Sequence, residues 1–486
     1  MRIELVIVFF LMALACLDAA VLRVPKDHNS IQEAINVAAP GDRIEVEQGV
    51  YYESIALKKD VTLRSVGNDE RGSRGLVRAE KTVIDGKDLG NVSGVTMAEG
   101  AILDGFTITR FGKYDSEEWE RHWTERGENQ SYEHIGKFGA PAIAIVGVSC
   151  KVENNIVSHN GDTGIGNIGA DGLTSFPLII NNTCFRNMGG GIGSMKGAGG
   201  IISKNKCFEN FYAGIGHNGA SPIVENNTCY NNVRAGIGIS NAASPIVKKN
   251  HCYKNRRAGI GIRSGEETKP LIEQNECNEN GMAGIGVEKK ASPTIRNNNC
   301  HSNLMAGIGS RGGSSPLITG NHCHKNKAAG IGINSATPKI IDNLSEKNHL
   351  AGIGISGDSD AYVFKNRLIE NRLVAIGVPD GAKAHVQDNI MIRSGGMPPM
   401  VAVLGKSEVI LMSNSIQGGG VAGILLDGKL TAIGNKIEGN NRGSGIAARK
   451  DSHLKISDNE ISNYQKEVND SGATIISIDT PNDVEE

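Results

Sequence analysis

Aromatic side chains are scarce in this sequence. Phe, Tyr and Trp make up 4% of the 486 residues, and Trp occurs only twice, whereas glycine occurs 63 times. Aromatic residues normally supply much of a compact core, so this composition argues against a compact α/β enzyme. The net charge is −2 and the charges are interspersed, which argues against a global field that would recruit nucleic acid or an anionic membrane.

Long apolar runs are also missing, because no stretch approaches the ~20 apolar residues of a membrane-spanning helix. The apolar run at 5–14 follows Met1 and Arg2 and precedes small residues at 13–20, which is the layout of a secretory signal peptide. We therefore expect residues 1–20 to direct export to the periplasm, the cell surface or the medium. Lipid anchoring at Cys16, which follows "ALA", is the alternative.

A repeat of about 23 residues organises the sequence. Its marker is the central Ile of a "GIG" or closely related segment, and successive markers are 22 to 27 residues apart. An asparagine stands ten residues before every marker, from Asn155 to Asn366, and another stands five residues before, from Asn160 to Asn371. The markers are Ile165, Ile192, Ile215, Ile237, Ile260, Ile285, Ile308, Ile331, Ile353 and Ile376.

Each repeat contains short segments with alternating apolar residues, which are typical of strands rather than helices. A period of this length with three short strands predicts an all-β fold, a single-stranded right-handed parallel β-helix with ~23-residue coils. The two asparagine columns would form amide ladders at the turns. Ser30 and Glu33 have capping-box spacing, which predicts a helix at 31–38 that covers the N-terminal end of the coils.

The segments "IQEAINVAAPGDRIEVEQGVYYESI" (31–55), "TVIDG" (82–86) and "GAILDGFTITR" (100–110) resemble the entry coils of the pectin-lyase-like right-handed β-helix superfamily. The resemblance covers most of the chain after residue 20 and implies the fold. It leaves the function open, because that superfamily includes polysaccharide lyases, hydrolases, esterases, epimerases, non-catalytic surface proteins and periplasmic copper-maturation factors. No cofactor is evident, although calcium would be implied for a lyase.

The expected organisation follows the period. Residues 21–111 form the cap and the first coils, 112–140 a polar insertion, 141–464 the regular repeats, and 465–486 a C-terminal tail or cap. The insertion contains "SEEWERHW" (116–123), which predicts a short helix with both tryptophans on one side.

Seven cysteines form one column, eight residues before consecutive markers. Alternation places them inside, where cysteine acts as a small apolar residue. The alternative is a thiol column that binds a soft metal such as copper. The column contains Cys184, Cys207, Cys229, Cys252, Cys277, Cys300 and Cys323.

Candidate catalytic residues gather around the insertion, because long insertions on a solenoid frequently carry function. We expect His122 to face His159, Asp162 and Asp171 from the coils beneath, while Trp119 and Trp123 contact a ligand. The alternative is that the insertion only seals an edge of the core.

The glycine segments predict a binding surface. Alternation puts the isoleucines of "AGIGI" inside and both glycines outside, which gives a smooth ribbon of backbone. Arginine on its edges would bind carboxylate or sulfate groups. The alternative is that a loop, the tail or another subunit packs over the ribbon. The edge residues expected to bind a ligand are Tyr212, Arg234, Arg257, Arg263 and Arg311, and His217 is expected to bind it from beneath the insertion.

Three functions remain open from the sequence. The first is an exported protein that binds, and cleaves or modifies, an acidic polysaccharide along the ribbon, as a lyase, glycoside hydrolase or epimerase. The second is a non-catalytic binding module for glycans or a partner protein, and the third is a metal-handling protein that uses the cysteine column. Nucleic acid is not expected as a partner, and the sequence does not indicate an oligomeric state.

Overall fold

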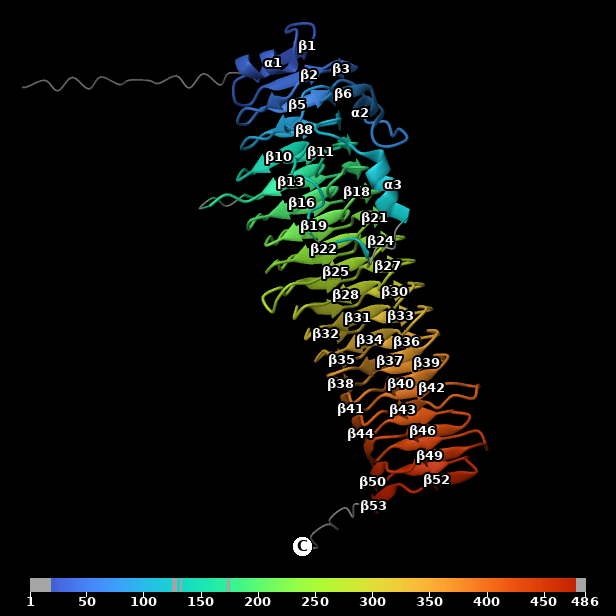
Figure 1. Ribbon diagram of the computed structural model, residues 1–486. Helices are drawn as coiled ribbons and strands as arrows, with labels where there is room; N and C mark the ends of the chain where they lie inside the picture. Colours follow the sequence, from blue (N-terminus) through green and yellow to red (C-terminus); the bar gives the residue numbers. More distant parts are fainter. Residues whose placement is uncertain (1–18, 125–128, 132, 172, 174, 478–486) are drawn as a thin grey trace, which may run out of the picture.

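The chain winds into a right-handed parallel β-helix, a column in which each coil stacks on the one before it (Figure 1). The computed structural model describes residues 19–124, 129–131, 133–171, 173 and 175–477. Cys16 and nearly all of the expected signal peptide lie outside the described residues, as does the end of the tail, 478–486. No helix of the described part is long and apolar enough to cross a membrane.

Three parallel sheets, A, B and C, form the sides of the column, and each regular coil gives one strand to each. One coil, for example, consists of β23 (Ile246–Lys248), β24 (His251–Tyr253) and β25 (Ile260–Ile262). The first and last strands are β1 (Val21–Val24) and β53 (Thr474–Ser477) in sheet A, β3 (Gly49–Tyr51) and β51 (Glu460–Ser462) in sheet B, and β4 (Ile55–Ala56) and β52 (Lys466–Asp470) in sheet C.

Sheet C carries the glycine segments in strict register. Ile237 pairs with Ile260, and Gly238 pairs with Gly261, one coil further on. The strands of sheet C in the glycine-rich coils are β13 (Ile165–Ile168), β16 (Ile192–Met195), β19 (Ile215–Asn218), β22 (Ile237–Ser240), β25 (Ile260–Ile262), β28 (Ile285–Val287), β31 (Ile308–Arg311), β34 (Ile331–Asn334), β37 (Ala351–Ser356) and β40 (Val374–Val378).

The core fills the column from end to end, and similar small or aliphatic residues stack at most of its inward positions. In the coil of Cys252, the inward side chains are Val247 from sheet A, Cys252 from sheet B, and Ile260 and Ile262 from sheet C, and none is more than 1% exposed. Because inward and outward side chains alternate along a strand, these short strands bury a continuous apolar core without aromatic residues.

Both predicted asparagine ladders are present and buried. The Oδ1 atom of Asn275 accepts hydrogen bonds from the backbone N–H and the Nδ2 of Asn250, at 2.9 and 3.0 Å. The Nδ2 of Asn250 also donates to the Val224 carbonyl at 2.9 Å. This pattern recurs from coil to coil, so polar backbone groups that the turns bury are satisfied. The prediction from the two columns is confirmed.

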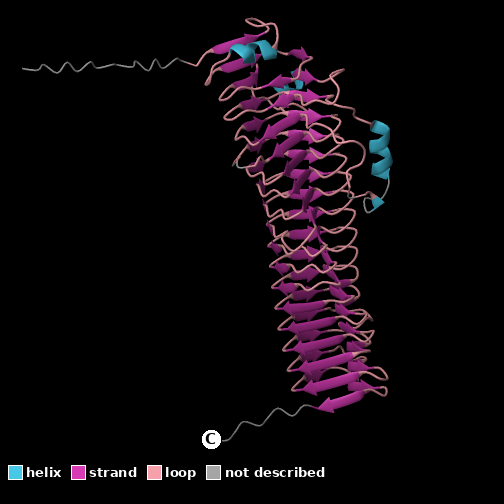
Figure 2. Cartoon of the chain, turned by 60° about the vertical axis from the view of Figure 1, so that its left-hand side comes forward, coloured by secondary structure: helices cyan, strands magenta, loops and turns pink. Residues whose placement is uncertain are grey.

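The N-terminal end is covered by α1 (Ile31–Val37), as expected (Figure 2). The Ser30 hydroxyl accepts a hydrogen bond from the Glu33 N–H at 3.1 Å, and Ile31, Ala34 and Ile35 are buried. At the other end the coils continue past residue 464, since β52 and β53 still pair with the coil before them.

Two excursions leave the column in the N-terminal half. The first contains α2 (Val77–Lys81), between β5 (Thr62–Ser65) and β6 (Thr82–Asp85). The second is the insertion after β9 (Thr107–Thr109), and its helix α3 (Ser116–Thr124) lies outside the stack of coils (Figure 2). The observed helix places Trp119 and Trp123 on one side, as predicted, and their stacked rings have centres 5.4 Å apart.

Candidate functional site

A groove of about 890 Å³ runs along the outer face of sheet C, from the coil of β13 to that of β40. Its floor consists of the second glycine of each segment, and eight of them face the groove. At the central positions an added Cβ would meet nothing closer than an alanine methyl of the preceding coil, at 3.4 to 3.9 Å. The floor glycines are Gly193, Gly216, Gly238, Gly261, Gly286, Gly309, Gly332 and Gly354.

The first glycine of each segment is not part of this surface, which corrects the expectation that both glycines face outward. A Cβ on Gly236 would lie 2.7 Å from the Gly259 carbonyl oxygen, 2.9 Å from the Asn255 Nδ2 and 3.0 Å from the Cys252 Cβ. The strand β22 begins only at Ile237, so strand alternation does not extend to Gly236. Gly236 and its counterparts sit at the tight turn into sheet C, against the asparagine ladder.

The floor is bounded at both ends. At Gly166 an added Cβ would meet the Pro141 ring at 2.8 Å, so the end of the insertion covers that position. At the other end, a Cβ added to Gly377 would lie 3.2 Å from the Val374 side chain. With ~4.8 Å between coils, the seven steps from Gly193 to Gly354 give roughly 34 Å of open floor.

The edges of the groove differ in character. Four arginines and one glutamate line it, which leaves an excess of positive charge. Glu288 accepts hydrogen bonds from the Nε and Nη2 of Arg311, at 2.9 and 2.6 Å, and Arg263 lies on the same edge. The opposite edge carries Met282 and Met305. Arg234 and Arg257 occupy the same positions on this edge in the two preceding coils, so both edges carry positive charge above a floor of small side chains.

The helix of the insertion packs on the flank beside the groove and covers apolar turn residues. Trp119 is 3% exposed and clusters with Phe211 and Val233, and its Nε1 donates to the Glu209 carbonyl at 2.8 Å. Trp123 packs against the same cluster. This arrangement agrees with the alternative in which the insertion seals an edge of the core. The two tryptophans, which were expected to contact a ligand, instead pack against the coils.

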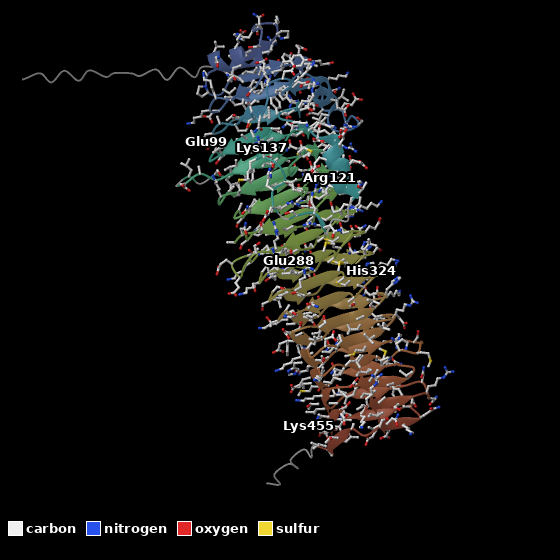
Figure 3. The ribbon with its side chains drawn as sticks, viewed as in Figure 1. Glu99, Arg121, Lys137, Glu288, His324 and Lys455 are labelled. Carbon is white, nitrogen blue, oxygen red and sulfur yellow. The ribbon has the colours of Figure 1, made fainter. Side chains whose placement is uncertain are left out.

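The second half of the insertion is tied to the near end of the groove. Arg234 donates from Nε to the Gln130 Oε1 at 2.7 Å and from Nη2 to the Glu133 carbonyl at 2.8 Å, and Arg257 donates to the Gln130 carbonyl. The Tyr212 hydroxyl accepts from the Ile135 N–H at 2.5 Å. These three side chains line the groove as expected, but the hydrogen bonds just described hold the insertion. Figure 3 labels Arg121 and Lys137 from its two halves.

The four candidate catalytic residues do not form one site. Asp162 accepts from the backbone N–H groups of Gly139 and Thr163, each at 2.6 Å, and so fixes the end of the insertion. Asp171 is exposed on a turn between sheets C and A. His122 packs edge-on against Phe211, with ring centres 4.8 Å apart. His159 lies on the sheet B flank, where its ring meets Tyr114 and Phe185.

His217, expected beneath the insertion as a ligand-binding residue, points into the core. It stands two residues after Ile215, so both side chains face inward on the same strand. Its ring is 3% exposed, and neither ring nitrogen has a hydrogen-bond partner among the described residues. Burial lowers the pKa of His217 to about 3, so the ring is neutral at pH 7. In the next coil the same position is occupied by Ile239.

The seven-cysteine column lies inside sheet B, and each of its side chains is 0% exposed. Burial raises the pKa of the Cys207 and Cys229 thiols well above the usual value. Each cysteine pairs in register with the next, and the cysteines of the described chain are all free. No group of three or more His, Cys, Asp or Glu side chains in the described part could hold a metal ion. This supports the interpretation as small apolar core residues.

The family model described as "Right handed beta helix region" matches residues 133–268 and 258–391. The chain belongs to this family. No curated protein sequence matches it.

Several solved structures share the fold. The A-module of the mannuronan C-5 epimerase AlgE6 from Azotobacter vinelandii is 16% identical over 89% of this chain and 93% of its own, with a TM-score of 0.43. The catalytic unit of a GH87 α-1,3-glucanase from Streptomyces thermodiastaticus strain HF3-3 is 12% identical over 76% and 61%, with a TM-score of 0.40. The periplasmic alginate epimerase AlgG is 13% identical over 82% and 83%, with a TM-score of 0.38. These likenesses concern the fold alone.

Sequence reasoning missed the alanine that precedes each pair of glycines. Ala235, Ala258, Ala283 and Ala306 line the groove beside the floor glycines and are 8% exposed. The signal was present, because alanine recurs two residues before most of the markers. Pro141, which covers the end of the floor, could not be recognised in this way, because it follows the insertion and has no counterpart in the other repeats.

Proposed function

We propose that this protein binds a linear, acidic polysaccharide along the groove of sheet C and does not cleave it. The observation that carries the proposal is the groove itself, with roughly 34 Å of floor at the coil spacing and no side chain larger than alanine on it. Such a floor accepts an extended chain lying flat, whereas a compact ligand would use only a fraction of it.

The charges of the groove support an acidic ligand. Arg263 and Arg311 lie on the edge away from the insertion, while Glu288 is the one carboxylate among the lining residues. Guanidinium groups bind carboxylate and sulfate through paired N–H donors. A chain of acidic sugars would meet Arg263 and Arg311 two coils apart, with Glu288 in the coil between them.

The positions of the candidate catalytic residues support binding without cleavage. His122 and His159 lie on the flank rather than in the groove, and Asp162 has both oxygens engaged by backbone N–H groups. Glycosidic hydrolysis needs a pair of carboxylates, whereas Glu288 is the one carboxylate among the residues that line the groove.

The test is a binding panel with the full chain, using polygalacturonate, alginate and hyaluronan as acidic ligands and dextran as a neutral one. The double variant Gly261→Thr with Gly286→Thr places two branched side chains on the floor, and Gly395→Thr is the control because an added Cβ there would meet nothing within 4 Å. We expect an acidic polymer to bind, the floor variant to lose at least about tenfold in affinity, and the control to bind normally.

Two results would contradict the proposal: retention of none of the acidic polymers, or equal binding by the floor variant and the native chain. The same samples are assayed for new reducing ends and for unsaturated sugars. Their appearance would show that the protein is an enzyme, in contradiction to the second half of the proposal.

A further inference from the structure

A separate cavity of about 240 Å³ lies on the sheet B flank, away from the groove. It forms where the excursion that contains α2 lies against the coils, and Tyr114 from the start of the insertion contacts one of its lining residues, His159. Its lining residues are Arg74, His159, Phe185, Arg186, Phe208 and Glu209.

The walls of this cavity are firmly packed. Leu76 and Ala79 of the first excursion cluster with Ile156 and Phe185 of sheet B. A Cβ on Gly75 would lie 2.8 Å from the Ile156 side chain, so the backbone of the excursion touches the sheet directly. A site built on such packing is already formed before a ligand enters.

Two polar groups at the cavity lack hydrogen-bond partners. Among the described residues, the Arg74 guanidinium makes no hydrogen bond or ion pair and instead lies over the Phe185 ring, 4.5 Å from its centre. The His159 ring likewise makes no hydrogen bond within the described part, and it contacts Tyr114 and Phe185 edge-on at 5.0 and 5.5 Å. Both groups can therefore offer hydrogen bonds to a ligand.

The local charge is positive. Arg186 is neutralised by Glu209, whose Oε2 accepts from its Nε at 2.6 Å, whereas Arg74 has no such partner in the described chain. Burial, together with Arg186 and Arg74, lowers the pKa of His159, so its ring is neutral at pH 7. One uncompensated guanidinium and one neutral imidazole suit a ligand with a single negative charge.

The remaining walls are aromatic. The rings of Phe185 and Phe208 stack 5.0 Å apart and only 2° from parallel, and Phe208 stacks in turn on Tyr230. Their edges supply an apolar surface next to the cationic group, which favours a ligand that has a flat apolar body as well as an anionic group.

We propose that this cavity binds a small planar organic acid, whose carboxylate is held by Arg74 and His159 and whose apolar body lies against Phe185 and Phe208. The site is independent of the polysaccharide groove. It uses Arg74 of the first excursion and side chains on the sheet B flank, none of which lines the groove.

Benzoate is the probe, and benzamide is its neutral counterpart of the same shape. Binding to the full chain is measured by ligand-observed NMR titration, with acetate as a carboxylate that lacks the flat body. We expect saturable binding of benzoate, and binding at least about tenfold weaker for benzamide and for acetate, because one lacks the charge and the other the apolar contact.

Arg74→Gln and His159→Asn test the two polar groups. Asn tolerates the left-handed backbone of position 159, where φ is 55°, and Arg74 is exposed, so both variants should fold. We expect each to weaken benzoate binding, Arg74→Gln by at least about tenfold. Arg71→Gln is the matched control, since Arg71 belongs to the same excursion but does not line the cavity.

Three results would overturn the proposal. They are the absence of saturable benzoate binding to the native chain, equal binding of benzoate and benzamide, and unchanged binding by Arg74→Gln. Each result is independent of the polysaccharide panel, because the floor glycines and the cavity lie on different sheets.

Discussion

The two glycines of each "GIG" segment lie in opposite surroundings although only one residue separates them. Gly259 is enclosed, with the Gly284 carbonyl 2.7 Å and the Asn280 Nδ2 2.9 Å from where a Cβ would be. Gly261 faces the open groove, where the Ala235 methyl at 3.7 Å is the nearest neighbour of such a Cβ. The inner glycine is required by the fold, and the outer glycine is available for a ligand.

This difference shows that one repeated residue type serves two purposes. The inner glycine lets the turn into sheet C approach the asparagine ladder and the next coil closely, which is a steric requirement. The outer glycine is in a strand position that would accept a β-branched residue, and its lack of a side chain leaves the floor of the groove smooth. Only the second purpose concerns function.

The strongest test of the comparison exchanges one glycine of each kind. We expect Gly259→Thr to lower the free energy of unfolding by more than about 3 kcal/mol, because the added atoms overlap backbone and ladder atoms that cannot move apart. Gly261→Thr should leave it within about 0.5 kcal/mol. Equilibrium urea denaturation measures both.

Equal stabilities for these two variants would show that the inner and outer positions are equivalent, contrary to the structure. A loss of stability in Gly261→Thr alone would mean that the groove is packed over in solution.

The ladder behind the inner glycine gives a second, smaller effect. Asn280 accepts from the Asn255 N–H at 3.1 Å and donates to the Cys252 carbonyl at 3.0 Å. Asn280→Ala leaves these buried groups unpaired, so we expect a loss of about 1–3 kcal/mol in the free energy of unfolding. Asn440→Ala, at an exposed turn, is the control and should change little. Similar values for the two variants would contradict a structural role for the ladder.

His217 sharpens the comparison within a single strand, since it follows the outer glycine Gly216 but faces the core. We expect His217→Ile to raise the free energy of unfolding by about 1–2 kcal/mol, because a buried ring without hydrogen bonds is replaced by the residue of the next coil. An unchanged or lowered stability would indicate that the ring has partners in solution.

The same variant should alter the pH dependence of stability. The folded-state pKa of His217 is lowered to about 3 from an unfolded value of about 6.5, so the unfolded chain binds more protons between these values. This group therefore removes stability as the pH falls through that window, and His217→Ile should flatten the curve there. His349→Gln, at an exposed position, is the control and should leave the curve unchanged.

Much of the fold could be predicted because each coil repeats the same sequence pattern after about 23 residues. The asparagine columns, the inward cysteines and the helix capped by Ser30 all follow from local spacing and alternation, and each is found in the structure. The candidate site was predicted less well. Strand alternation does not hold across the turn at Gly236, so it gave the wrong direction for the first glycine. It does hold within the strand of His217, which shares the inner face of that strand with Ile215.

The sequence by itself determined the coil, the direction of its side chains within strands and the sheet that carries the row of exposed glycines. Those properties depend on contacts between equivalent positions one period apart. Only the tertiary structure decided that the insertion holds Tyr212, Arg234 and Arg257 and that Pro141 closes one end of the floor. It also decided that Arg74 and His159 line one cavity. These contacts join segments without periodic relation, so no spacing in the sequence records them.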